Sequence, residues 1–457
     1  MLEWINRYVF GAAVPLCLLG VGLYFLVTLR FFPFTRSRAV LGYFAKREKG
    51  EGTSPLRALC LALAGTLGVG NIVGVSSAIY LGGFGAVFWM CLSALAAMIL
   101  KYAEIVLAMR HRRRRETGGY GGGAPYYISD ILAARGLPKM GRGMAAVFAV
   151  LCIADAIFMG CVIQVNAVSS SLAGVLSVPP LLSGAVLAVL CLLLFSQKEG
   201  SVGAVTERLV PFMSVAYVVL SLWCIFVRRG DLGWAIGRIF EDAFRPQSAA
   251  GGVLGFLFSR ALRFGSMRGL VSNEAGCGTS PIAHASSNAK SPVEQGFFGL
   301  VEVFVDTILL CSMTALVVVL NYDAASAFGE NPMMMTIRAY SAPFSGGTAV
   351  AVEAFLAVAV LLFGFATLIC WGHYGVQSLA YLTENRGVRG AFVLVYSLFA
   401  VFGAVSAPAS VWTAADLAIG AMTVINVAVL FLGRREVRRE TFVYFGFGKK
   451  RAKKQKK

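Results

Sequence analysis

The chain has 457 residues, of which 58% are hydrophobic and 14% are charged, and its mean hydropathy is +0.73. Soluble domains carry about 25% charged residues, so this composition indicates a polytopic membrane protein with no separate soluble domain. The apolar residues come in blocks of roughly 20, which is the length that crosses a bilayer core of about 30 Å.

The net charge of +18 is typical of nucleic-acid-binding proteins, but its distribution excludes that class. The positive residues lie between the apolar blocks and at the C-terminal end, in "RREVRRE" and "GKKRAKKQKK". Positive charge beside apolar spans orients membrane proteins, and a Lys-rich tail attracts anionic lipid. We therefore expect a lipid bilayer, and no nucleic acid, as the partner of these charges.

Cysteine and histidine usage argues against a disulfide framework and against a metal centre. Nearly all of the ten cysteines fall singly inside apolar blocks, and no CxxC occurs. Such cysteines are small buried apolar residues. Only three histidines are present, so a histidine-based metal site is not expected.

We predict about eleven transmembrane spans in chain order. They lie at about 9–29, 57–80, 84–109, 145–176, 180–196, 209–227, 251–289, 296–320, 349–382, 390–406 and 411–433. The first block is as long as a full span and lacks an Ala-x-Ala-like exit, so it is not expected to be a cleaved signal peptide. Most Lys and Arg residues fall in alternate loops, which predicts an N-terminus outside the cell and a cytoplasmic C-terminus in the plasma (inner) membrane.

Two of these spans are interrupted by glycine and polar residues. The first, within "LALAGTLGVGNIVGVSSAIYLGG", carries Asn71 among the glycines Gly65, Gly68, Gly70 and Gly74. The second, within "RFGSMRGLVSNEAGCGTSPIAHA", carries the polar residues Ser272, Asn273 and Glu274 among Gly265, Gly269, Gly276, Gly278 and Pro281. Unpaired backbone groups are unfavourable in lipid, so such breaks persist only inside protein or beside a water-filled cavity.

The spacing of the two breaks predicts a fold. One glycine-rich span alone indicates close helix packing. Two interrupted spans, five spans apart, indicate a transporter with inverted repeats. The predicted single transporter domain covers 1–433, with an extra helix at 9–29, a first repeat at 57–227 and a second at 251–433, followed by a basic cytoplasmic tail at 434–457.

Broken membrane helices favour a particular kind of ligand. The N-terminus of a half-helix presents free N–H groups and a positive dipole end, which suit a carboxylate. Exposed carbonyl oxygens suit Na⁺ or an ammonium group. The pattern therefore predicts a zwitterionic amino acid carried together with a cation.

Five stretches resemble a known family: "GTLGVGNIVGVSSAIYLGGFGAVFWM", "GGGAPYYI", "RGLVSNEAGCGTSPIAHA", "FVDTILLCSMTALVVVL" and "GFATLICWGHYG". They are similar, in order, to motifs of the sodium:alanine (alanine or glycine:cation) symporter family of the amino acid-polyamine-cation superfamily. The resemblance covers about residues 10–433. It implies an all-α polytopic membrane protein of the leucine-transporter-type fold, with five-plus-five inverted repeats, and not an enzyme. The implied activity is Na⁺-coupled symport of a small neutral amino acid, alanine or glycine, into the cell by alternating access.

The chain departs from the family pattern at a few positions. Cys91 stands for Trp, Val271 for Phe, Ala366 for Ser, Cys370 for Gly and His373 for Tyr. Val271, Ala366 and Cys370 are expected close to the substrate or the ion. They leave open an alternative: a proton-coupled or altered-specificity amino-acid transporter of the same fold.

The first break and the family pattern together suggest part of the substrate site. We expect the backbone of Thr66, Leu67, Gly68 and Gly70 to meet the substrate carboxylate, because glycine lets ligand and backbone approach closely. Asn71 contacts the ligand, fixes the break, or caps the second half-helix.

Further substrate contacts are expected from other spans. In the second break, carbonyls of Val271, Ser272 and Asn273 are expected to face the ammonium group, with Gly276 and Gly278 leaving room. The resemblance implies that Gln164 is a substrate contact and that Trp371 limits the substrate side chain. The structural alternatives are an interhelical hydrogen bond for Gln164 and generic packing for Trp371.

For the Na⁺ that serves as coupling ion, the resemblance implies a site where the first broken helix meets a later span. The expected ligands are the carbonyls of Ala64, Leu67 and Phe363 and the hydroxyl of Thr367, which is also a substrate-site candidate. The intramembrane acids Asp155, Glu274, Glu302 and Asp306 are functional candidates by default. We expect ion pairing for them, in the case of Glu274 with Arg260, Arg263 or Arg268.

Two other classes of membrane protein fit the sequence less well. A channel needs a ring of like charges or a filter. A membrane enzyme needs a nucleophile–base or metal constellation, and neither pattern is found. The glycine-rich stretch near Tyr120 lacks the following Lys-Ser/Thr of a phosphate loop and is interpreted as a hinge. The sequence gives no indication of an oligomeric state.

Overall fold

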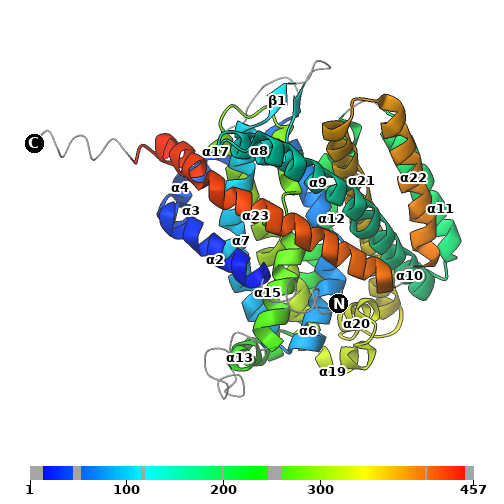
Figure 1. Cartoon of the computed structure of the whole chain (residues 1–457). Helices are drawn as coiled ribbons and strands as arrows, with labels where there is room; N and C mark the ends of the chain where they lie inside the picture. Colours follow the sequence, from blue (N-terminus) through cyan, green and yellow to red (C-terminus); the bar gives the residue numbers. More distant parts are fainter. Residues whose placement is uncertain are drawn as a thin grey trace, which may run out of the picture.

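The computed structural model describes residues 14–44, 53–114, 119–197, 200–244, 260–406 and 409–447 (Figure 1). Helices dominate this part of the chain. The first half contains α2 (Val14–Thr28), α3 (Phe32–Thr35), α4 (Ser37–Phe44), α5 (Pro55–Thr66), the π-helix η2 (Gly70–Gly74), α6 (Val75–Gly82), α7 (Gly85–Arg110), β1 (Arg113–Arg114), β2 (Tyr120–Gly121), α8 (Ala124–Ala133), α9 (Pro138–Ile157), the π-helix η3 (Phe158–Ile163), α10 (Gln164–Leu176), α11 (Pro180–Phe195) and α12 (Ser201–Val227).

The second half has a similar make-up. It contains η4 (Arg229–Asp231), α13 (Leu232–Ala243), α15 (Arg260–Asn273), α16 (Ser280–Ala285), α17 (Pro292–Val303), the π-helix η6 (Phe304–Cys311), α18 (Ser312–Leu320), α19 (Tyr322–Ala325), η7 (Ser326–Phe328), α20 (Pro332–Ser341), α21 (Gly346–Leu382), α22 (Arg386–Val405) and α23 (Ala409–Phe445).

The polytopic helical character that the composition predicts is confirmed. Among the residues that the structure describes, seven helices are long and apolar enough to cross a membrane, or eight if the bent pair of α5 and the η2–α6 segment is one span. Two more apolar helices, α2 and α11, are shorter. The predicted count of eleven spans and the five-plus-five repeat stay predictions.

Several helices differ in extent from the predicted spans. α9, η3 and α10 form one span that starts at Pro138, before the expected 145–176. α23 continues through residues 434–445, which were expected to belong to the tail, as one helix to Phe445. Residues 9–13 of the first predicted span and 251–259 of the seventh lie outside the described residues.

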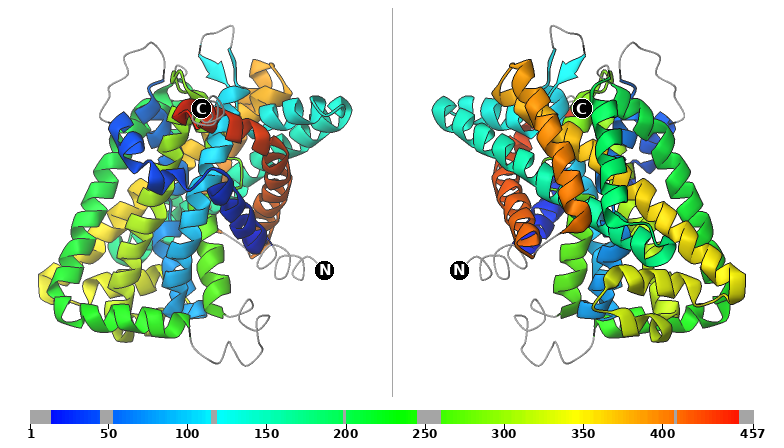
Figure 2. Two further views of the ribbon diagram at one scale, coloured as in Figure 1. Left: turned by 90° about the vertical axis from the view of Figure 1, so that its left-hand side faces the viewer. Right: turned by 90° about the vertical axis from the view of Figure 1, so that its right-hand side faces the viewer.

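Short helices form one end of the molecule. α13, α19 and α20 lie together there, and the β1–β2 hairpin lies at the opposite end (Figure 2). These helices occupy stretches that hydropathy alone assigns to loops. At α20 the sequence supplies its own start signal: Pro332 is in the first turn, and the side chain of Asn331 accepts a hydrogen bond from the Met334 N–H at 3.2 Å. Pro near the start and Asn at the N-cap are favoured in this arrangement.

Helix α7 lies in the centre of the helix bundle. All of its residues from 99 to 109 are buried, and α15, α16 and α17 pack against it. A helix that is buried all round is surrounded by protein rather than lipid. α7 nevertheless carries Lys101 and Glu104 within this buried stretch, so charged groups lie at the core of the molecule.

Candidate functional site

The first predicted break is present between α5 and η2. The helix ends at Thr66, Leu67 leaves helical geometry with ψ 63°, and the two arms differ in direction by 53°. Gly68 is required at the bend, because a Cβ there would lie 2.8 Å from Thr367 Oγ1 and 3.0 Å from Gln164 Oε1. The glycine therefore lets the unwound backbone touch side chains from two other spans.

Gln164 binds the unwound backbone directly. Its Oε1 accepts a hydrogen bond from the Val69 N–H at 3.1 Å. Gln164 is the first residue after the π-helix η3, which widens the span and re-aims the side chains that follow. Such π-segments occur frequently at functional sites.

The second predicted break lies between α15 and α16. Glu274, Gly276 and Gly278 all have positive φ, at 52°, 87° and 81°. Asn273 holds the turn together: its Nδ2 donates to the Gly269 carbonyl at 2.6 Å, and its Oδ1 accepts from the Ala275 N–H at 3.1 Å. A self-capped break of this kind keeps its shape without a ligand.

A cavity of about 530 Å³ lies beside the two breaks. Six of the predicted substrate residues line it: Thr66, Gly68, Gly70, Gln164, Ser272 and Trp371. Other lining residues come from α20 and from the charged side chains Arg268, Glu274 and Glu330. Arg268, which begins the "RGLVSNEAG" motif, lines the cavity but is not among the predicted substrate residues. Its Nη2 lies 3.4 Å from Ser77 Oγ.

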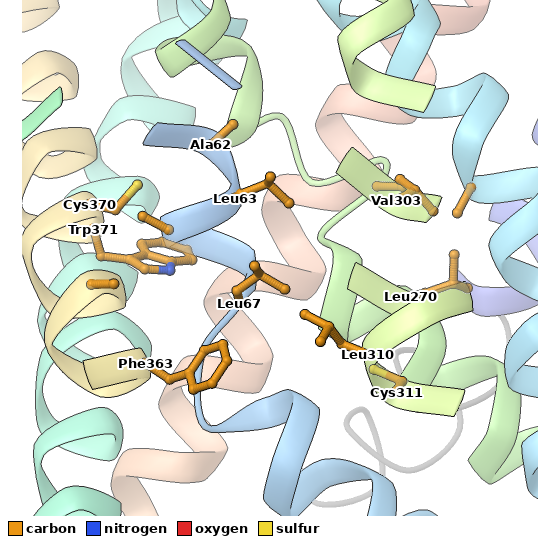
Figure 3. Close-up of a cluster of buried hydrophobic side chains, with 14 of the residues drawn as sticks. Ala62, Leu63, Leu67, Leu270, Val303, Leu310, Cys311, Phe363, Cys370 and Trp371 are labelled. Atoms are coloured by element: carbon orange, nitrogen blue, oxygen red, sulfur yellow. The ribbon is translucent and has the colours of Figure 1, made fainter. Parts of the chain in front are cut away.

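Figure 3 shows how apolar side chains flank the first break. Leu67 lies between α21, which carries Phe363 and Trp371, and Leu310 on the other side. Leu67 is fully buried, so its side chain packs in the core while Trp371 contributes to the cavity wall.

The structure places the remaining predicted substrate residues away from the cavity lining. Gly276 faces α2 and α23, because a Cβ there would lie 2.2 Å from Leu18 Cδ2 and 3.5 Å from Val427 Cγ2. Gly278 faces Phe148, and its N–H donates to Glu104 Oε1 at 3.0 Å. These two glycines shape the turn and its packing.

Asn71, Asn273 and Thr367 are buried behind the lining residues, where they hold neighbouring segments together. The side chain of Val271 lies outside the described residues.

Three of the four predicted cation ligands meet in one place. The Thr367 hydroxyl lies 2.9 Å from the Ala64 carbonyl oxygen and 3.1 Å from the Phe363 carbonyl oxygen. Leu67 follows directly after the last residue of α5, on the same side of the break. Carbonyl and hydroxyl oxygens are the hard donors that alkali and alkaline-earth cations prefer, so this donor set fits a Na⁺ ion.

A second polar cluster joins the two breaks to the π-helix η6. Asp306 accepts hydrogen bonds from Asn71 Nδ2 at 2.6 Å, from Ser272 Oγ at 3.0 Å and from Thr307 Oγ1 at 2.7 Å. Asn71 Oδ1 is buried and has no hydrogen-bond partner among the described residues. The sequence singled out Asp306 as an intramembrane acid, but the spacing could not reveal that Asn71 and Ser272, from different spans, converge on it.

The family departures have structural roles next to the site. The Cys370 thiol lies 2.9 Å from the Leu61 carbonyl, so it contacts the first half of the broken helix rather than the cavity. Ala366 is fully buried. Cys91 Sγ lies 3.2 Å from Ser312 Oγ on α18. Of these residues, Cys370 therefore contacts the broken helix that lines the cavity.

A buried ionic network lies between α7, α16 and α17. Lys101 Nζ is 3.2 Å from Glu302 Oε1, and both side chains are fully buried. The other Glu302 oxygen lies 3.1 Å from His284 Nε2, and His284 Nδ1 lies 2.7 Å from Gln295 Nε2. Glu302 is thus ion-paired as expected. Glu274 instead accepts a hydrogen bond from Thr279 Oγ1 at 2.6 Å, and no pairing with the predicted arginines occurs among the salt bridges of the described residues.

Comparison with known proteins adds to this geometry. The whole chain, residues 1–457, matches the sodium:alanine symporter family. The sodium/alanine symporter AgcS of Methanococcus maripaludis is 33% identical over 99% of this chain and 98% of its own length. An uncharacterised transporter of Haemophilus influenzae is 35% identical over 97% of this chain and 96% of its own length. A manganese transporter of Eremococcus coleocola shares the fold, with a TM-score of 0.53 at 14% identity, over 84% of this chain and 81% of that one.

Proposed function

The chain belongs to the sodium:alanine symporter family, and from this premise we propose that it carries a small neutral amino acid, alanine or glycine, into the cell together with Na⁺. The protein is a multi-pass membrane transporter and not an enzyme. The proposal concerns the substrate, the coupling ion and the individual site residues.

One observation carries the proposal: oxygen ligands and an unwound backbone are brought together beside one cavity. The Thr367 hydroxyl and the carbonyls of Ala64 and Phe363 converge on the first broken helix. The same broken helix presents Thr66, Gly68 and Gly70 to the cavity. A cation bound by these oxygens orders the break, and the ordered break then binds the amino acid.

The substrate proposal rests on the lining of the cavity. The N–H groups after the break provide a positive dipole end for the substrate carboxylate. Gln164 fixes these groups through Val69. Ser272 also lines the cavity, and carbonyls of the second break are suited to the ammonium group. Trp371 closes one wall, which favours a short substrate side chain.

The transport mechanism follows from the two breaks. We assign one repeat to 57–227 and the other to 251–433, with the N-terminus outside and the C-terminus in the cytoplasm. A bundle that contains both broken helices then moves against the remaining helices to expose the cavity alternately to each side. The hydrogen bonds from Asn71 and Ser272 to Asp306 join the two broken helices, so they are expected to move together.

The alternative is a proton-coupled or altered-specificity transporter of the same fold. The Asp306 cluster favours this alternative, because a buried carboxylate can bind a proton as well as lie beside a sodium ion. Amino-acid accumulation driven by a pH gradient in Na⁺-free buffer would identify this alternative.

Equilibrium binding tests the proposal. Purified protein in detergent is incubated with radiolabelled alanine in Na⁺ or in choline, and unlabelled amino acids compete. The proposal predicts binding only in Na⁺, with competition by alanine and glycine. Equal binding in choline would contradict Na⁺ coupling, and the absence of binding in both buffers would contradict the substrate.

A further inference from the structure

Asp155 is a buried carboxyl group without hydrogen-bond partners. It lies on α9, in the span that continues through η3 to Gln164, and its side chain is fully buried. Neither Oδ1 nor Oδ2 has a hydrogen-bond partner among the residues that the structure describes. An isolated carboxylate in such surroundings is strongly disfavoured unless it is neutralised.

The other buried carboxyls in the described part of the chain all have donors. Glu104 accepts from the Gly278 N–H, Glu274 from Thr279, Glu302 from Ser280 and Asp306 from Asn71. Buried charges in proteins are normally stabilised in this way. Among these described buried carboxyl groups, Asp155 is therefore the one whose ionised form has no hydrogen-bond donor to stabilise it.

Two acidic side chains lie on segments that pack against α9. Glu274 lies in the second break, which packs against α9 where Gly278 faces Phe148, and Asp416 lies on α23, which also packs against α9. Both are acidic, and like charges raise the energy of an ionised carboxylate. Arg268, which could offset them, interacts with Asp416.

The remaining titratable groups around Asp155 are uncharged side chains or an imidazole. Cys152 lies on the same helix and interacts with Asp155. α21 packs against α9 and carries His373 and Tyr374 in that stretch. α8 carries Tyr127, whose hydroxyl bonds to Asn426 Oδ1. No group of three His, Cys, Asp or Glu side chains in the described residues is placed to hold a metal ion. A bound proton neutralises Asp155 without any further ligand.

We propose that Asp155 is a proton-binding site, which exchanges its proton with the substrate cavity through Glu274 and makes amino-acid transport proton-dependent. This inference rests on the proposed symport function for its link to transport. The O–H bond of Asp155 breaks, the proton passes to the Glu274 carboxylate, and Glu274 then releases it to water in the cavity that it lines. Each transfer breaks one O–H bond and forms another, and the proton ends on water as hydronium, so that Asp155 and Glu274 are then both ionised.

The positions of Asp155 and Glu274 link this proton to the proposed movement of the helices. Asp155 lies on the span that carries Gln164, and Glu274 lies in the break of the other interrupted helix. When Asp155 is ionised, it repels Glu274 across this boundary. Loss of the proton therefore favours separation of α9 from the second break, and proton binding favours the arrangement seen in this structure.

Infrared spectroscopy tests the proton site without any transport assay. At neutral pH the intact protein is expected to show the carbonyl stretching band of protonated carboxyl groups, and Asp155→Asn is expected to remove the part of this band that comes from Asp155. Asp323→Asn, at an exposed position on α19, is the matched control and should leave the band unchanged. A band of equal intensity in Asp155→Asn would overturn the proposal.

Isotope labelling keeps the test decisive if Asp155→Asn does not fold. In the unsubstituted protein, heavy-carbon labelling of the aspartate carboxyl groups should shift the band. A band that does not shift would come from a glutamic acid and would overturn the assignment.

The link to transport has a separate readout. Alanine uptake under a fixed Na⁺ gradient is measured as a function of external pH. The wild type should show a pH-dependent rate, and Asp155→Asn should transport at a rate that changes less than twofold over the same range. An unchanged pH profile in Asp155→Asn would overturn the coupling. If the wild type transports no alanine but Asp155→Asn removes the infrared band, the proton site stands and the proposed substrate fails.

Discussion

The hydrogen bond from the Val69 N–H to Gln164 gives the most specific prediction about the site. The substitution Gln164→Ala removes the acceptor and leaves a buried backbone N–H without a partner. An unsatisfied buried group costs about 1–3 kcal/mol. The structure shows this bond at 3.1 Å between the break and the span that faces it, so the loss falls on the segment proposed to bind the substrate.

The magnitude can be converted to an affinity. Because each 1.4 kcal/mol is a factor of ten, the dissociation constant for alanine is expected to rise by about 5- to 150-fold in Gln164→Ala. The assay is saturation binding of radiolabelled alanine to the purified protein at a fixed, saturating Na⁺ concentration. Ser170→Ala is the control, since Ser170 lines the same cavity from the same span but is exposed.

Two results would refute this reasoning. If Gln164→Ala binds alanine within twofold of the wild type, Gln164 does not organise the break. If Ser170→Ala loses as much affinity as Gln164→Ala, the effect reflects any change in the cavity rather than the bond to Val69.

Three further substitutions test other parts of the account. Thr367→Val removes a proposed Na⁺ ligand without changing side-chain size, and we expect the Na⁺ concentration for half-maximal alanine binding to rise roughly tenfold or more, since hydrogen bonds to charged groups contribute about 1.5–3 kcal/mol. Lys101→Met removes the buried ammonium partner of Glu302, which then keeps its contacts with Ser280 and His284; the loss should lower the free energy of unfolding by about 3–5 kcal/mol and the thermal midpoint in detergent with it. Gly160→Ala places a Cβ 2.2 Å from Trp371 Cβ; the overpacking should destabilise the protein by about 1–3 kcal/mol and weaken alanine binding by moving the cavity wall.

Each of these substitutions has a matched control. Thr367→Ser keeps the hydroxyl and should retain most of the Na⁺ affinity; equal loss in both variants would remove Thr367 from the cation site. The double variant Lys101→Met with Glu302→Gln should be more stable than Lys101→Met alone. Gly174→Ala, on the same span as Gly160 with its nearest neighbour atom at 3.7 Å, should be nearly neutral.

The sequence could predict the class of fold because hydropathy and glycine placement act locally. A lipid-facing helix must be apolar over its length, and a break in it must be glycine-rich or polar. Both interruptions lie where the sequence predicts them, at Leu67 and after Asn273. The short helices α13 and α20 were missed because they lie outside the apolar blocks on which the prediction depends.

The sequence could predict individual site residues only where a residue type has a single plausible function at its position. The family resemblance implies Thr367 and Gln164. Thr367 contacts the first break, and Gln164 both lines the cavity and makes an interhelical hydrogen bond, which was its structural alternative. Gly276 and Gly278 could not be distinguished from ligand-facing glycines, because a glycine that serves positive φ and one that admits a ligand look identical in sequence. The direction that each faces is set by tertiary packing against Leu18 and Phe148.

The sequence could not show which side chains from distant spans come together in the fold. Asp306 meets Asn71 and Ser272 through three separate helices, and the π-helices η2 and η6 bring these side chains into register. A π-helix has no reliable local signature in composition. The missing partners of Asp155 could likewise be recognised only after every neighbouring element was placed.

Concentrative uptake tests the central claim most directly. Purified protein in proteoliposomes is given external radiolabelled alanine with an inward Na⁺ gradient, with choline in place of Na⁺, or with an ionophore that collapses the Na⁺ gradient. The account predicts that alanine accumulates above its external concentration only while the Na⁺ gradient persists, and that Thr367→Val greatly reduces this accumulation. Accumulation that is equally strong in choline, or that is unaffected when the Na⁺ gradient is collapsed, would contradict Na⁺-coupled symport.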